Sequence, residues 1–304
     1  RTQFNSISEL LKEFYSKRDA LTRIRQKSAD LRKIVSTALE RSCKKADIQE
    51  KQLKDTEKRE QYRIYGELIN AYGYNIPEGS RSFTALNYYT NEEITIPLDE
   101  NLSPQENAVR YFSRYNKLKR TFEAESVQIK ETMAEIAHLE SIAASLDIAV
   151  SEDDLAQIKE ELIEAGYIHR HQQPSKKAKI TSKPLHYISS DGFDIYVGKN
   201  NFQNDELTFK FANGNDWWFH AKNMAGSHVI LRTVGKEIPD RTFEEAAALA
   251  AHYSKGHGQD KVEVDYVLKK EVKKPAAAKP GFVVYYTNYS MIAATSIDNI
   301  KQSG

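Results

Sequence analysis

The first 70 residues constrain the fold more than any other part of the chain. They contain no proline, and no glycine precedes Gly66. Their apolar residues recur at the spacing of a helical seam, with one additional four-residue step that resembles a stutter. The positions are Phe14, Leu21, Ile24, Leu31, Val35, Leu39, Cys43, Ala46 and Leu53. The pattern predicts a long helix with a narrow apolar stripe, which needs a partner helix because the rest of its surface is polar.

A later segment can supply that partner. Ser103, Pro104 and Glu106 form a helix start, with Ser103 as the N-cap. The seam that follows consists of Phe122, Ile129, Ile136 and Ala143, with Tyr115 and Met133 at intermediate positions. A third helix is predicted from a capping box of Ser151 and Asp154 to a stop at Gly166. We therefore expect residues 1–72 to pair with residues 104–170, which contain the second arm and a return helix, in an antiparallel coiled-coil hairpin; pairing between two copies of the chain is the alternative.

Two shorter segments separate these parts. Residues 73–103 alternate aromatic and aliphatic residues with polar ones and contain Pro77, Gly79 and Pro97, which predicts a small strand-containing module. Residues 171–182 have no periodicity and contain several lysines, so they are the expected linker.

The final segment, residues 183–304, is long enough to bury a core of its own. Strands are expected at 185–190, 193–197, 207–211, 228–233, 262–268 and 281–287. A helix should begin at a capping box of Thr242 and Glu245 and end at Gly256. The fold class predicted for the whole chain is α+β: a long coiled-coil hairpin with a small insertion, followed by a mixed α+β domain.

The charge is uneven along the chain although the total is only +1. The net charges of residues 1–60, 61–104, 105–170 and 171–304 are +6, −4, −5 and +4. Cys43 is the single cysteine, which excludes an intramolecular disulfide and a Cys-based zinc site and suits a reducing compartment. The chain begins with Arg1 rather than Met and has no export leader, so we expect a cytoplasmic piece of a longer protein.

A lysine-rich connection, residues 269–281, is the first candidate binding site. It carries Lys269, Lys270, Lys273, Lys274 and Lys279, with Glu271 as its single acidic residue. Such a cluster is stabilised by an anion, and nucleic-acid phosphate is the natural candidate. A solvated hairpin loop is the alternative.

Amides, aromatic residues and histidines form the second candidate. Amides can read base edges and aromatic rings can stack on bases, which suits single-stranded or looped RNA. We expect the amides to be exposed and to contact RNA; the alternative is that Asn and Gly pairs form turns. Trp218 and Phe219 are expected in the core. Outside the lysine-rich connection, the candidate RNA-binding residues are Lys199, Asn200, Asn201, Gln203, Asn204, Lys210, Trp217, His220, Lys222, Ser227 and His228.

Catalytic motifs are not found. Ser227 and His228 are neighbours on a predicted strand and would point to opposite faces, which does not suit a nucleophile and its base. The histidines lack metal-ligand spacing, and Val197-Gly198-Lys199 lacks the glycines of a phosphate-binding loop. No enzyme activity, metal or cofactor is predicted.

The chain resembles the NFACT family. The resemblance to its RNA-binding C-terminal domain is carried by Asp191-Gly192, Val197-Gly198-Lys199-Asn200-Asn201, Gln203-Asn204-Asp205, Leu207-Thr208, Asp216-Trp217, His220 and Gly226-Ser227-His228-Val229. Further matches are Glu245-Ala246-Ala247, Ala251-His252-Tyr253-Ser254-Lys255, Val272-Lys273-Lys274-Pro275 and Lys279-Pro280-Gly281-Phe282-Val283. Gly66-Glu67-Leu68-Ile69 and the predicted coiled coil resemble the family's middle region.

The resemblance implies a ribosome quality-control function. Family members bind a large ribosomal subunit obstructed by peptidyl-tRNA and recruit tRNA, alanyl-tRNA in bacteria, to add a non-templated tail. The coiled coil would reach stalk-base proteins, and the C-terminal domain would lie against RNA. The family's N-terminal domain and helix-hairpin-helix segment, which carry its main tRNA contacts, would precede Arg1. Because some members carry the label fibronectin-binding protein, a surface adhesin for fibronectin or fibrinogen is the alternative function.

Overall fold

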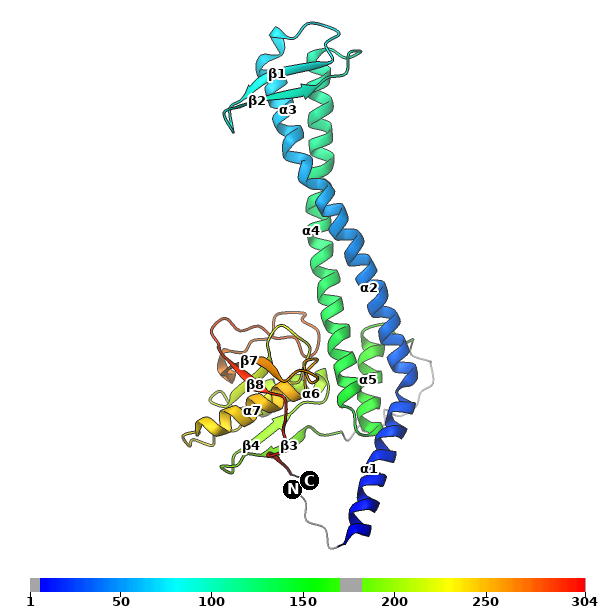
Figure 1. The fold of residues 1–304 in the computed structure, drawn as a ribbon, viewed down its shortest axis with the longest axis vertical. Coiled ribbons are helices and arrows are strands. Elements are labelled where there is room, and N and C mark those ends of the chain that lie inside the picture. The colour runs from blue at the N-terminus through cyan, green and yellow to red at the C-terminus, as the bar shows by residue number, and fades with distance from the viewer. Residues whose placement is uncertain (1–5, 170–181, 304) are drawn as a thin grey trace. The chain divides into compact units, whose positions relative to one another are not determined.

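The computed structural model describes residues 6–169 and 182–303, which form two compact units. One unit comprises residues up to 40 together with residues from 136 onward, and the other comprises residues 41–135. Helices α2 (Ala29–Asp55) and α4 (Pro104–Ile148) contribute residues to both units (Figure 1). The predicted linker falls outside the described residues except for Ser182.

The unit of residues 41–135 contains the strand module. The 3-10 turn η1 (Thr56–Lys58), helix α3 (Arg59–Tyr72) and turn η2 (Gly73–Asn75) follow α2. Strands β1 (Ser82–Asn87) and β2 (Glu92–Pro97) form an antiparallel hairpin with Ser82 opposite Pro97. Leu68 and Ile69 of α3 pack with Ile96 of β2 and Tyr111 of α4. The prediction of strands in residues 73–103 is therefore confirmed.

The start of α4 was also predicted correctly. The Ser103 hydroxyl accepts a hydrogen bond from the Glu106 amide at 3.3 Å, and the Ser103 amide donates to Glu106 Oε2 at 2.8 Å. Pro104 occupies the first helical position, where its missing N–H costs nothing.

The seam differs from the prediction at four positions. Cys43, Phe14 and Met133 are exposed, whereas Ser42 is buried. The additional four-residue step falls between Val35 and Leu39, and the seam then continues at Ser42, Ala46 and Gln49. The polar residues Ser42 and Gln49 occupy two of these seam positions, which an apolar pattern cannot reveal. The side chain of Leu21 is not among those described.

Four helices pack together in the other unit. Helix α1 (Ile7–Lys27) and the start of α2 contribute Ile24, Leu31 and Val35 to a core shared with the end of α4 and with α5 (Glu152–Glu164). Ser151 caps α5 through the predicted capping box with Asp154. Gly166, at φ +82°, ends this helical region in the left-handed conformation. The pairing of the two arms within one chain confirms the hairpin and not the intermolecular alternative.

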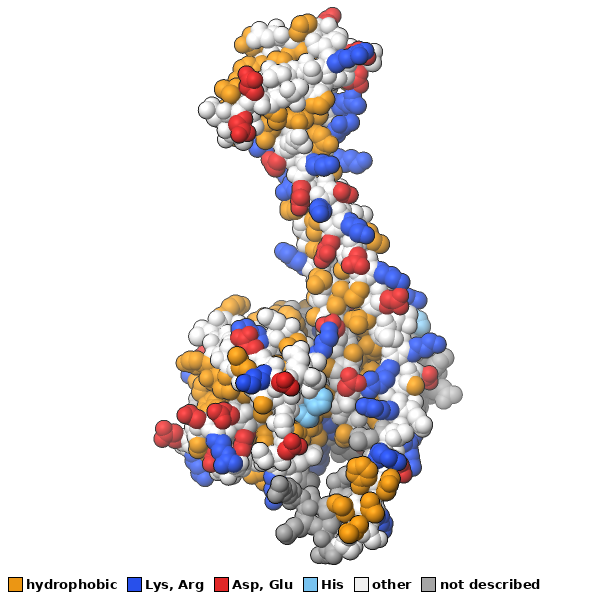
Figure 2. Space-filling view, viewed as in Figure 1, with side chains coloured by type: hydrophobic (Ala, Val, Ile, Leu, Met, Phe, Trp, Pro, Cys, Tyr) orange, Lys and Arg blue, Asp and Glu red, His pale blue; other side chains and the backbone are white. Residues whose placement is uncertain are grey.

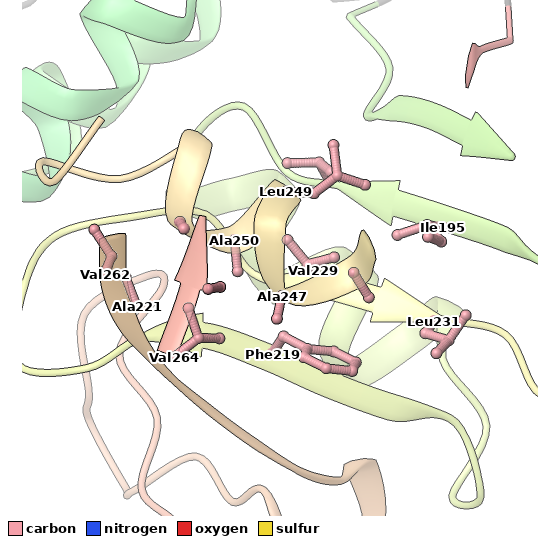
Figure 3. Close-up of a cluster of buried hydrophobic side chains, with 14 of the residues drawn as sticks. Ile195, Phe219, Ala221, Val229, Leu231, Ala247, Leu249, Ala250, Val262 and Val264 are labelled. Atoms are coloured by element: carbon pink, nitrogen blue, oxygen red, sulfur yellow. The ribbon is translucent and has the colours of Figure 1, made fainter. Parts of the chain in front are cut away.

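Residues 182–303 form an antiparallel sheet domain in the same unit. The strand order is β8-β7-β5-β6-β4-β3-β9. The strands are β3 (Leu185–Ile188), β4 (Asp194–Val197), β5 (Trp217–Ala221), β6 (Val229–Leu231), β7 (Lys261–Leu268), β8 (Tyr289–Ala294) and β9 (Lys301–Gln302). Helix α7 (Asp240–His252) covers one face, where Phe219, Val229 and Leu231 meet Ala247 and Leu249 (Figure 3). The α+β fold class is confirmed, and Trp218 and Phe219 are buried as expected.

Three local predictions were wrong in this domain. Residues 207–211 form the π-helix η3 (Leu207–Phe211), closed by a 2.9 Å hydrogen bond from the Ala212 amide to the Leu207 carbonyl. Residues 281–287 contribute only a bridge between Val284 and Lys273, and the strand is β8 instead. Helix α7 begins after Pro239 and ends at His252, before Gly256, and the Thr242 hydroxyl donates to Asp191 Oδ2 rather than capping the helix.

Candidate nucleic-acid interface

The amide run begins helix α6 (Asn201–Glu206), and it is buried. Asn200 is the N-cap, because its side-chain oxygen accepts a 3.0 Å hydrogen bond from the Gln203 amide. Gln203 Oε1 in turn accepts from the Lys199 amide at 3.1 Å. Lys199, Asn200, Asn201, Gln203 and Asn204 are all buried. The expectation that these amides are exposed was therefore wrong, since their hydrogen-bonding groups serve the fold.

These residues form hydrogen bonds and an ion pair with helices α4 and α5, and we call this set of contacts the polar junction. Its members are His138, Ser141, Asp154, Gln157 and Glu161 of α4 and α5, and Ser182, Lys199, Asn200, Asn201 and Gln203 of the sheet domain. Asn201 Nδ2 donates to Glu161 Oε1 and to the Ser141 hydroxyl, at 2.7 Å each. Most of the polar groups buried at this boundary are paired across it, with Glu161 Oε2 as an exception, and this pairing holds the sheet domain in one register on the helices.

Lys199 and Asp154 form the charged centre of the polar junction. Lys199 Nζ lies 2.5 Å from Asp154 Oδ1, and the two side chains are 7% and 1% exposed. Burial alone would raise the pKa of Asp154. Hydrogen bonds from Lys199, Ser182 and the Val150 amide outweigh that effect and hold this pKa below its usual value. Asp154 is therefore a carboxylate throughout the neutral range.

A second set of contacts links Glu161 to the lysine-rich connection. Glu161 Oε1 lies 3.0 Å from His138 Nε2, and Lys279 Nζ lies 3.4 Å from His138 Nδ1. Lys274 forms an ion pair with Asp205, whose other oxygen accepts from the Gly281 amide at 3.0 Å. Two of the five predicted phosphate-binding lysines are therefore occupied within the protein.

Three lysines of the connection are not held in this way. Lys269 lies over the Phe209 ring, with Nζ 5.9 Å from the ring centroid. Lys270 and Lys273 are exposed. Within residues 6–169 and 182–303, none of the three has an acidic partner, and the same holds for the exposed Lys210 at the end of η3. These four cations are the predicted residues that remain available to phosphate.

Three further predicted residues, His220, Ser227 and His228, lie within the sheet domain. His228 Nδ1 pairs with the Thr208 hydroxyl at 2.8 Å. Burial, together with a smaller effect of the neighbouring His220, lowers the pKa of His228 to about 3. Burial also lowers the pKa of His220. Ser227 is buried and donates to the Gly198 carbonyl at 2.5 Å. These three side chains support the fold.

Trp217 and Lys222 are half-buried and lie at opposite ends of β5. Trp217 packs edge-on against Phe243 at 5.1 Å, on the α7 face of the sheet. Lys222 forms a 2.6 Å ion pair with Glu263. Trp217 lies opposite Leu268, the residue before Lys269, but its ring packs on the α7 face. Lys222 lies at the other end of the strand and is paired with Glu263.

The acidic half of the polar junction is not evident from the sequence motifs. In the sequence, Asp154 is marked only as part of a capping box, and no motif contains Glu161. The available signal was their position: both share a helical face with the buried Ile158 and Leu162, where a carboxylate requires a partner.

Metal sites and membrane spans were also sought among the described residues. Among them, no group of three or more His, Cys, Asp or Glu side chains could hold a metal ion. No helix in that part of the chain is long and apolar enough to cross a bilayer. Figure 2 shows cationic and anionic side chains interspersed over the exposed surface of α2.

Comparison with known proteins matches both the helical part and the sheet domain to known domains. Residues 1–181 match the NFACT N-terminal and middle domains, and residues 183–287 match the NFACT protein RNA binding domain. Rqc2 homolog RqcH from Streptococcus suis is 40% identical over 299 residues, covering 98% of this chain and 53% of that protein. Rqc2 homolog RqcH from Bacillus subtilis is 36% identical over 302 residues, covering 98% and 52%. The chain thus spans about half the length of these relatives.

A solved structure agrees with these matches. It is the C-terminal part of the fibronectin/fibrinogen-binding protein from Streptococcus suis, which is 36% identical to this chain with a TM-score of 0.69. The similarity covers 91% of this chain and 97% of that one. The same helical and RNA-binding parts therefore occur together in a known structure. With both parts matched along nearly its whole length, the chain belongs to the NFACT family.

Proposed function

We propose that this chain is the coiled-coil and RNA-binding part of a ribosome quality-control factor. It binds the obstructed large ribosomal subunit and tRNA, alanyl-tRNA in particular, and supports template-independent alanine tailing of the stalled chain. It acts in the cytoplasm as a binding factor and not as an enzyme. The similarity to Rqc2 homologs over 98% of this chain and the match to an RNA-binding domain support the proposal.

The polar junction is the observation that carries the proposal. A domain that only had to bind RNA could be joined to the helices by a free linker. Here Lys199 and Asn201 are buried against Asp154 and Glu161, so the RNA-binding domain is fixed to α4 and α5. We infer that this fixed position matters because the factor binds RNA through one part while its coiled coil reaches stalk-base proteins.

Binding to large ribosomal subunits and to tRNA over a salt series tests this function. The triple variant Lys269→Gln, Lys270→Gln and Lys273→Gln should weaken binding and lower the slope of log affinity against log salt, by about 0.7 to 0.9 for each phosphate that is no longer neutralised. The control Lys236→Gln, Lys261→Gln and Lys301→Gln removes the same charge from exposed positions of the same domain. A salt-independent affinity, or equal losses in both triple variants, would contradict the proposal.

An adhesin for fibronectin or fibrinogen is the second candidate function. It is favoured by one observation, the similarity to a structure of a fibronectin/fibrinogen-binding protein at TM-score 0.69. The chain should then bind immobilised fibronectin saturably at physiological salt, and excess tRNA should not displace it. Displacement by tRNA would instead indicate that a basic RNA-binding surface attracts matrix proteins nonspecifically.

A further inference from the structure

A row of side chains crosses the sheet on the face opposite α7. The strand register places His186, Tyr196, Ile230, Trp218 and Val267 side by side on β3, β4, β6, β5 and β7. The row is fully buried at Val267, Trp218 and Ile230, whereas Tyr196 and His186 are half-buried. One end of the row therefore opens to solvent and presents aromatic rings there.

The rings at this open end are arranged closely. The His186 and Tyr196 rings stack, with centroids 4.6 Å apart and planes 6° from parallel. Phe211 meets Tyr196 edge-on at 4.7 Å and is 38% exposed. Phe211 ends the π-helix η3, and wide turns of this kind often occur at functional sites. Exposing a large apolar ring beside a second aromatic ring offers a flat ligand a surface to stack on.

Arg232 covers the Phe211 ring, and lysines lie in the neighbouring chain segments. Arg232 lies over it with Cζ 4.6 Å from the ring centroid, and its Nε lies 3.0 Å from Asp216 Oδ2. The adjacent Lys210 is exposed, and Lys270 joins the same region because its amide donates to the Gly214 carbonyl at 3.1 Å. Asp216 accepts from the Lys269 amide through its own carbonyl at 2.8 Å. Rings and cationic residues from four chain segments are thus brought into one region, where Asp216 holds Arg232 in place.

The charge distribution selects the orientation of a ligand. Asp194 lies at the His186 end, where its Oδ1 is 2.7 Å from His186 Nε2, so that end disfavours phosphate. Lys210, Lys269 and Lys270 lie at the Phe211 end and have no acidic partner among the residues described. A base can stack at the ring while its phosphates lie toward the lysines. Bases inside a duplex are already stacked and cannot make this contact.

We propose that Tyr196, Phe211, Arg232, Lys210 and Lys270 form a site for an unstacked base of single-stranded RNA. Phe211 supplies the stacking surface, Arg232 covers one face of the same ring, and the two lysines hold the flanking phosphates. The site rests on the proposed function, because it assumes that the sheet domain binds RNA, and it names the form of RNA that is bound.

A fluorescent single-stranded RNA tests the site. The probe is a 12-nucleotide oligouridine with one central 2-aminopurine, and a 12-base-pair RNA duplex is the competitor. Stacking quenches 2-aminopurine, so binding of the unaltered chain should quench it, and the duplex should compete poorly. Phe211→Leu keeps an apolar side chain against Tyr196 but removes the ring, which should abolish the quench and weaken binding about tenfold. Phe211→Trp should restore both.

The lysines should behave differently from the ring. Lys210→Gln with Lys270→Gln should lower the salt slope by about 1.4 while the quench at saturation persists. The control Tyr289→Leu removes a 61%-exposed ring on the α7 face and should change neither quantity. A quench that survives Phe211→Leu, or binding without any quench, would overturn this site and leave the proposed function standing. Failure of the unaltered chain to bind either RNA or ribosomal subunits would overturn both.

Discussion

Lys199 Nζ lies 2.5 Å from Asp154 Oδ1, and this contact joins the start of helix α5 to the loop before α6. Asp154 performs two tasks, since its Oδ2 accepts the Ser151 and Val150 amides while its Oδ1 faces Lys199. One carboxylate thus caps a helix and anchors a second domain to it. The pairing explains why a lysine in a run of amides is buried.

Breaking this ion pair should be costly. Lys199→Met leaves Asp154 buried without a cation, and we expect a loss of about 3–5 kcal/mol in the free energy of unfolding. The double variant Lys199→Met with Asp154→Asn should recover part of that loss, because no buried charge remains. Urea denaturation of the four proteins in this cycle measures the coupling. Lys255→Met, which removes the more exposed pair with Glu140, should cost at most about 1 kcal/mol.

Two histidines with lowered pKa values, His220 and His228, should make stability depend on pH. The pKa of His228 is about 3 and that of His220 is also lowered, so below the ordinary value of 6.5 the unfolded chain binds protons that the folded chain does not. Stability should be full above pH 6.5 and fall by about 1.4 kcal/mol per pH unit for each histidine as the pH drops toward the folded pKa.

Urea unfolding at pH 7.5, 6.5, 5.5 and 4.5 checks this expectation. His228→Asn should be less stable at pH 7.5, because it loses the contact with Thr208, but it should show a shallower decline on acidification. His169→Asn, at an exposed position, is the matched control. An identical pH slope in His228→Asn and the unaltered chain would contradict the assignment.

Gly281 should tolerate no side chain. Its φ is +77°, and a Cβ there would overlap the side-chain oxygen of Asn201, which belongs to the polar junction. Gly281→Ala should therefore destabilise the sheet domain by about 1–3 kcal/mol, from backbone strain and displacement of Asn201. Gly258→Ala is the control, because nothing lies within 4 Å of its added Cβ and its φ is not in that region. Thermal unfolding of both variants measures the difference.

A buried glutamine in the coiled coil should limit stability. Gln49 is 4% exposed, its Oε1 has no hydrogen-bond partner, and its Nε2 reaches Gln128 Oε1 only at 3.4 Å. Gln49→Leu should raise stability by about 1 kcal/mol, since it removes an unsatisfied acceptor from the seam. Gln52→Leu, one turn away at an exposed position, should have little effect. A lower melting temperature for Gln49→Leu would show that the polar position is required for correct pairing.

Periodicity and cap residues predicted the helical part well. Ser103 with Glu106 and Ser151 with Asp154 are local signals, and each is confirmed at the predicted residue. The prediction that Cys43 lies in the seam was wrong because Ser42 occupies that position. Whether a serine is buried depends on the partner helix and not on its own polarity. In the helical part, the cap residues could therefore be predicted from one segment. Which side chains are buried against the partner helix could not.

The candidate site depended on contacts that local patterns do not contain. Asn200, Asn201 and Gln203 are polar, and their burial becomes evident only when Asp154, Gln157 and Glu161, about 40 residues earlier, are placed beside them. Thr242 and Glu245 likewise matched a capping box but contact Asp191 and Ser190 instead. In both cases a residue distant in the sequence determines which hydrogen bonds the polar side chain forms.

The π-helix η3 contains one residue more than an α-helix of the same rise would need. Each residue turns an α-helix by about 100°, so deleting one residue from this turn would rotate everything after it by roughly that angle. Phe211 would then leave Tyr196, and Lys210 would point in a different direction. A related chain with the same sheet but one residue fewer in this turn would keep the fold and lose this aromatic surface. The length of the turn is therefore a better indicator of the surface than the identity of any residue in it.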